Sequence, residues 1–222
     1  MAILTFSLSK SWFFLDRGIN LAKEESGKEE TVEKEIVQSD EVERESRVIW
    51  KSFIYYPTDL MREDDSSGPQ KILHHARNLS FINLNNGKLH KVFEKKVYIY
   101  DYFPGDYSKT QTSFSSQEVI TDSIDIGYKF IILVMTIDTN KDGYLNYKDK
   151  ARIFIYDPLE EKLSDILPEN YFYEKILLNT KKNTLAFVVK KLNQSKKETY
   201  PSQIFLYDSL NDKGIIIVDD EK

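Results

Sequence analysis

Residues 152–162 read Arg-Ile-Phe-Ile-Tyr-Asp-Pro-Leu-Glu-Glu-Lys. Four apolar or aromatic residues end in an Asp, and a polar turn and a Lys follow. β-Branched and aromatic residues favour the pleated strand, whereas Asp and Pro favour turns. This stretch therefore predicts one strand of a β-hairpin, its turn, and the start of the second strand.

The same pattern occurs twice more in the chain. Residues 78–88 and 203–213 each align with 152–162, with an apolar strand, a terminal Asn or Asp, a tight polar turn and a Lys. The repeats are offset by 74 and 51 residues. The second offset is close to the period of about 40–50 residues in propeller blades. The first would be that period plus an insertion around 104–117.

Further strands are predicted upstream of each hairpin. An apolar segment precedes each one, at 48–56, 129–137 and 184–190, and another strand at 119–126 and 173–178 would bring the last two units to four strands. A sheet of this size cannot bury both faces alone, so the units must stack on their neighbours. The sequence therefore predicts an all-β protein built from antiparallel sheets of repeated hairpins.

Residues 48–218 resemble β-propeller repeats of the TolB type and related periplasmic propellers, on the strength of the "Tyr-Asp", turn and Lys pattern. The resemblance implies a propeller-like fold. Three clear units are fewer than the four to eight blades of a closed propeller, even if 4–15 adds a fourth. An incomplete propeller, an oligomer and a curved β-sandwich all remain open.

The chain divides into three predicted regions. Residues 1–17 form an N-terminal β segment, because apolar and polar residues alternate from Leu4 to Ser9. Residues 18–47 form a charged linker or marginal helix, since ten acids and five bases lie between Lys23 and Arg47. Residues 48–222 form the repeat-built β domain.

A cation-binding loop is predicted at residues 138–149. Oxygen-bearing residues stand at the first, third, fifth, ninth and twelfth positions, a Gly at the sixth allows a sharp turn, and the seventh would contribute its backbone carbonyl. Calcium prefers several hard oxygen ligands, and alternate positions of a tight turn can direct them to one point. The predicted Ca²⁺ ligands are Asp138, Asn140, Asp142, Tyr144, Asn146 and Asp149.

This loop resembles the EF-hand loop and, more closely, its dockerin variant, which carries Asn at the ninth position and Asp at the twelfth. Asp149 is shorter than the usual Glu, and the flanking segments look like strands, so a helix–loop–helix switch is not expected. The ion would have a structural role. The alternative is an ion-free turn, because Asp, Asn and Gly favour turns without any metal.

Composition excludes several classes of function. The net charge of −5 does not suit a protein whose main partner is nucleic acid, and no window reaches the roughly 20 apolar residues of a spanning helix. The absence of Cys excludes thiolate sites. The first ten residues lack a basic region, and Lys10 interrupts their apolar run, so they do not resemble a signal peptide. A calcium site of modest affinity nevertheless favours an extracytoplasmic location, periplasmic or secreted.

The function predicted from these features is a calcium-stabilised module, not an enzyme, that binds a protein or glycan and possesses no membrane span. Two alternatives remain: a carbohydrate-active enzyme with paired carboxylates, and a structural protein without a small ligand. The three histidines, His74, His75 and His90, do not predict a zinc site. Aromatic residues between 55 and 107 could form a sugar-binding platform, although strand packing explains them better.

Overall fold

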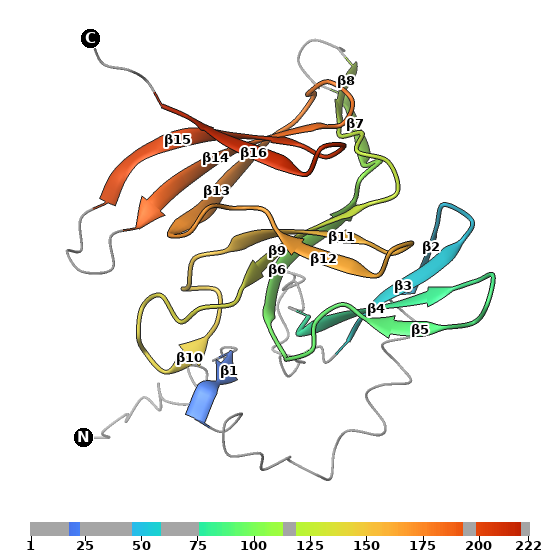
Figure 1. Ribbon diagram of the computed structural model, residues 1–222, viewed down its shortest axis with the longest axis horizontal. Coiled ribbons are helices and arrows are strands. Elements are labelled where there is room, and N and C mark those ends of the chain that lie inside the picture. Colours follow the sequence, from blue (N-terminus) through green and yellow to red (C-terminus); the bar gives the residue numbers. More distant parts are fainter. Residues whose placement is uncertain (1–17, 23–45, 59–75, 113–118, 193–198, 219–222) are drawn as a thin grey trace, which may run out of the picture.

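The computed structural model describes residues 18–22, 46–58, 76–112, 119–192 and 199–218. These residues form three four-stranded antiparallel sheets and two small two-stranded ones (Figure 1). The all-β prediction is confirmed, and none of the described sheets closes on itself. No helix in the described part of the chain has the length and apolar character needed to cross a membrane.

Two of the large sheets are simple meanders, and the middle one contains insertions. Sheet I has the order β2-β3-β4-β5, with strands Arg47–Ile49, Phe53–Thr58, Asn78–Asn83 and Leu89–Lys91. Sheet II has the order β12-β11-β9-β6, with strands Lys162–Asp165, Arg152–Asp157, Phe130–Met135 and Tyr98–Pro104. Sheet III has the order β13-β14-β15-β16, with strands Tyr171–Leu177, Thr184–Leu192, Thr199–Asp208 and Lys213–Ile217.

Both small sheets are connected to the insertions of sheet II. β7 (Ser108–Thr112) pairs with β8 (Val119–Ser123) between β6 and β9. β10 (Tyr144–Leu145) lies between β9 and β11 and pairs with β1 (Ile19–Asn20) from far upstream. Ile19 and Asn20 stand at the start of the predicted charged linker, and Leu21 and Ala22 after them are helical. The β segment predicted near the N-terminus, at residues 4–15, lies outside the described residues.

Two cores hold the three large sheets in a stack. The alternation of side chains across a strand sends Phe154 and Tyr156 of β11 into the core shared with sheet I, and Ile153 and Ile155 into the core shared with sheet III. β9 is buried along its whole length because it contributes to both cores. Sheet II therefore buries both faces on its neighbours, and sheets I and III each bury one face on sheet II, in line with the stacking that the repeat pattern predicted.

Three details of the strand prediction were wrong. The predicted strand 48–56 is two strands, joined by a turn in which Trp50 and Lys51 have positive φ angles of 49° and 56°. The predicted strand 119–126 does not complete sheet II; β8 pairs only with β7, and β6 takes the outer place. The insertion at 104–117 was predicted as a loop, yet it contains β7.

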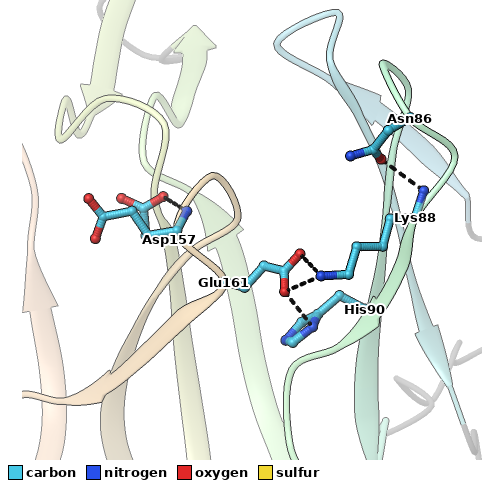
Figure 2. Close-up of polar contacts among 6 residues, drawn as sticks. Asn86, Lys88, His90, Asp157 and Glu161 are labelled. Carbon is cyan, nitrogen blue, oxygen red and sulfur yellow. Dashed lines mark hydrogen bonds and ion pairs between the residues drawn. The ribbon is translucent and has the colours of Figure 1, made fainter.

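Equivalent turns of the repeats contact one another through ion pairs. Lys88 Nζ in the β4–β5 hairpin lies 2.7 Å from Glu161 Oε1 in the β11–β12 turn (Figure 2). One repeat further on, Lys162 Nζ lies 3.1 Å from Asp212 Oδ2 in the β15–β16 turn. The ammonium of Lys88 lowers the pKa of Glu161, and the pKa of Asp212 is lowered first by the Tyr207 hydroxyl and then by Lys162.

Candidate functional site

The predicted calcium loop, residues 138–149, connects β9 to β11, the two central strands of sheet II. The chain reverses within it because Lys141 and Gly143 adopt positive φ angles of 61° and 83°. That backbone conformation is easiest for glycine, and Gly143 stands at the sixth position, where the sequence predicted the sharp turn. The two strands that the loop connects are largely buried.

Backbone amides of the loop hold the side chains of the first three predicted ligands. Asp138 accepts hydrogen bonds from Asp142 N at 3.2 Å and from Gly143 N at 2.9 Å. Asn140 Oδ1 also accepts from Asp142 N, at 2.9 Å, and Asp142 Oδ1 accepts from Tyr144 N, at 2.9 Å. The first, third and fifth positions of the loop are thus fixed on the same few amides. The structure brings together these three predicted site residues.

Asp149 closes the loop from its other end. Its Oδ1 accepts from Thr139 N at 2.8 Å and from Asn140 N at 3.3 Å, and its Oδ2 accepts from Asn146 N at 2.9 Å. Asp149 is only 5% exposed, and Asn146 is equally buried. A carboxylate at the twelfth position therefore joins the start of the loop to the backbone of its ninth position.

The loop contains three carboxylates, those of Asp138, Asp142 and Asp149, and two lysines, Lys141 and Lys148. Among the described residues, no lysine or arginine forms an ion pair with Asp138, Asp142 or Asp149. Each carboxylate has about four lone-pair sites, so an oxygen that accepts one amide hydrogen can still bind a metal. At Asp149 that oxygen is Oδ2, because Oδ1 already accepts three hydrogen bonds. In the described part of the chain, however, no three carboxylate or imidazole groups are close enough to hold a metal by themselves. Any Ca²⁺ site here would also need the oxygens of Asn140, Asn146 and the Tyr144 backbone.

Strand β1 lies against this loop, which the sequence did not predict. Ile19 pairs with Leu145 and Asn20 with Tyr144, and Leu21 N donates to Gly143 O at 3.2 Å. Ile19 and Leu145 share a small core whose other members are Tyr98, Met135 and Ala151. The seventh and eighth loop positions are thereby held by a segment more than 120 residues away. No local pattern could identify a strand of two residues.

Gly18 makes this docking possible, because it has a φ of +82° and sits against the loop. A Cβ at this position would overlap the Leu145 carbonyl oxygen. Gly18→Ala is expected to detach β1 and to lower the free energy of unfolding by about 2 kcal/mol, mainly through exposure of Ile19. Urea denaturation monitored by circular dichroism measures this loss.

Gly87→Ala is the matched control for that measurement. Gly87 has a similar φ of +70°, but a Cβ there would have no atom within 4 Å. The control should cost about 1 kcal/mol, the conformational penalty alone. Equal losses in the two variants would contradict a specific role for Gly18 in docking.

The remaining candidate residues are structural. His90 stacks on Tyr156, with ring centroids 5.8 Å apart, and its Nδ1 lies 3.5 Å from Glu161 Oε2 (Figure 2). His74 and His75 lie outside the described residues. The residues of the predicted aromatic platform lie in separate cores. Tyr55 and Tyr102 pack in the core between sheets I and II, and Phe103 and Tyr107 pack in the core between sheets II and III. Strand packing is therefore the role of these aromatic residues.

Comparison with known proteins adds no family. No protein-family model matches the chain, and a search of curated proteins finds no similar sequence. The fold and the loop are thus the basis for any functional conclusion.

Proposed function

We propose that this protein is a propeller-like binding module whose central loop, residues 138–149, is stabilised by Ca²⁺. A protein or a glycan is the proposed partner. An extracytoplasmic location suits this proposal, because calcium is abundant enough there to fill a site of modest affinity. The role of the ion would be structural, and no catalytic step is assigned to it.

The buried carboxylate of Asp149 is the observation that supports the proposal most. Burying a carboxylate is costly unless hydrogen bonds or a cation compensate for its charge. The Asp149 carboxylate accepts three backbone amides and the Thr139 hydroxyl, and two further carboxylates, those of Asp138 and Asp142, lie in the same loop. A hard divalent cation would neutralise the excess charge of this set.

The donor set suits calcium in its chemistry. Asp138, Asn140, Asp142, Asn146 and Asp149 offer oxygen atoms, and the Tyr144 backbone offers a carbonyl oxygen. Calcium accepts six to eight oxygen ligands in flexible geometry, whereas zinc favours nitrogen and sulfur. When bound, the ion would supply positive charge that holds the loop closed over Leu145 and β1.

Thermal unfolding with EGTA and with excess CaCl₂ tests the proposal. We expect calcium to raise the melting temperature of the wild-type chain, because a ligand that binds only the native state stabilises it by about 2.7 kcal/mol at 100 times its Kd. Asp138→Asn/Asp142→Asn should abolish this rise. Each substitution keeps one side-chain oxygen that can accept a loop amide while removing the charge.

Asp106→Ala provides the matched control, because Asp106 is an exposed carboxylate in a different turn. This variant should retain the full response to calcium, and MgCl₂ should give a smaller rise than CaCl₂. Superimposable melting curves of the wild-type chain in EGTA and in calcium would refute the proposal and leave residues 138–149 as an ion-free turn.

A further inference from the structure

The three large sheets pack in one consistent direction. We call the face of a sheet that points toward the next sheet in the chain its downstream face, and the other its upstream face. The downstream face of sheet I, with Leu79 and Phe81, packs on the upstream face of sheet II, with Phe154 and Tyr156. The downstream face of sheet II, with Ile153, packs on the upstream face of sheet III in the same way. The chain therefore makes the same kind of contact twice.

The downstream face of sheet III carries a row of apolar side chains that neither core includes. Residues that pair directly across antiparallel strands lie on the same face. The register places Leu177, Ala186, Leu206 and Ile215 in one such row across β13–β16. Val188, Ile204 and Ile217 form a second row. Ile215 is 58% exposed and Ile217 44% exposed.

The upstream face of sheet I carries a matching row. Val48, Ile54, Ile82 and Leu89 pair in register across β2–β5. Val48 is 65% exposed and Leu89 53% exposed. In both end sheets the apolar row lies beside the turn that follows the third strand, after Asn83 in one and Asp208 in the other. The stack thus ends in two apolar faces at its opposite ends.

We infer that these two end faces bind each other between two copies of this chain, head to tail. A downstream face and an upstream face are the two halves of the contact that the chain already makes twice internally. Two copies related by a twofold axis would make this contact twice more and form a closed ring of six sheets. Six is within the four to eight blades of known propellers, and under a twofold axis the downstream face of each copy meets the upstream face of the other, so that the interface is self-complementary and closed. The inference does not depend on the proposed calcium site.

The ion pairs between repeats support the same contact between copies. They also show one way in which it would differ from the two internal contacts. Lys88 and Lys162 each reach an acid in the turn of the next sheet, and Lys213 is their equivalent in sheet III. Gly87 of sheet I occupies the position of the acids Glu161 and Asp212. All three acceptor positions have positive φ angles, 70°, 52° and 51°. The contact between copies would therefore place Lys213 near a residue without charge.

Sedimentation velocity of the full chain over a wide concentration range tests the inference. We expect the mass of two chains for the wild type. Ile215→Glu/Ile217→Glu on one end face, and Val48→Lys/Leu89→Lys on the other, should each raise the dimer Kd about 100-fold or more, because they bury charges in an apolar contact. Combining all four substitutions in one chain should restore part of the affinity, since acids then meet lysines.

Cross-linking distinguishes head-to-tail contact from other arrangements. The chain contains no Cys, so Ile215→Cys on β16 and Leu89→Cys on β5, two exposed positions beside the turns that would meet, each introduce a single thiol. A short bismaleimide should link the two variants when they are mixed, and should link neither variant to itself. Leu159→Glu, at an exposed turn position outside both end faces, should leave the mass unchanged.

Gly87→Asp is expected to tighten the dimer about fivefold at low salt, because it would give Lys213 the acidic partner found in the other two contacts. Its effect should disappear at high salt. A single-chain mass at about 100 μM would overturn the inference. Three other results would also overturn it: weaker dimers for the variants of one end face but not for those of the other, self-linking of Ile215→Cys, or a mass that keeps growing with concentration.

Discussion

Phe130→Ala is expected to lower the free energy of unfolding by about 3–5 kcal/mol, the range for truncating a buried aromatic residue. Phe130 is fully buried at the start of β9. Its ring lies 4.8 Å from that of Tyr55 and 5.2 Å from that of Phe81, both in sheet I, between ring centroids. Removing the ring leaves a cavity at the contact between sheets I and II, which the rigid sheets cannot readily fill.

Urea denaturation monitored by tryptophan fluorescence measures this loss, because the ring of Trp50 packs on that of Phe130, with 6.2 Å between the ring centroids. Tyr128→Ala is the control. Tyr128 is 59% exposed and its ring also packs on Trp50, at 5.3 Å, so its loss should stay below about 1 kcal/mol. Similar losses in the two variants would show that the first core does not depend on Phe130.

Arg152→Met, as a single substitution, is expected to lower the free energy of unfolding by about 3–5 kcal/mol, because it leaves several buried groups without a partner. The guanidinium of Arg152 is almost completely buried. It bonds Asp165 Oδ2 at 2.9 Å, and it donates to the carbonyl oxygens of Pro168, Tyr171 and Leu167 at 2.7–3.0 Å. These contacts fasten the end of sheet II to the start of sheet III.

Two further variants test this role of Arg152. Arg152→Lys keeps the charge but lacks the fork of donors, so it should recover only part of the stability. Lys162→Met removes the exposed ion pair with Asp212 and should cost less than about 1 kcal/mol. Thermal and urea unfolding at neutral pH compare the three. A loss for Arg152→Met no larger than that for Lys162→Met would contradict the prediction.

Much of the fold could be predicted from the sequence. The three hairpins were visible because apolar strands, polar turns and a Lys recur at fixed positions, and all three are present at β4–β5, β11–β12 and β15–β16. The pairing of sheet II could not be predicted as well. Alternation shows that a segment is a strand but not which strand it pairs with, so β8 was placed in the sheet where β6 belongs.

Other features left no signal in the sequence. β7 runs Ser-Lys-Thr-Gln-Thr, and a strand without apolar residues cannot be distinguished from a loop by its periodicity. Trp50 and Lys51 form a turn without Gly or Asn, so the division of the first strand was hidden. The predicted metal ligands are brought into one loop, but the strand that pairs with it comes from residues 19–20. Contacts so distant in sequence have no local pattern.

The pairing of β1 with β10 has a consequence for how the chain folds. Within each large sheet the strands are mostly neighbours in sequence, so these sheets can form after short loop closures. β1 must instead close a loop of more than 120 residues for one short bridge and one buried isoleucine, and the entropy of that closure is recovered only once β10 is in place. We therefore expect β1 to be the last element to dock during folding and the first to open from the native state. The loop at residues 138–149 loses its neighbouring strand each time this opening occurs.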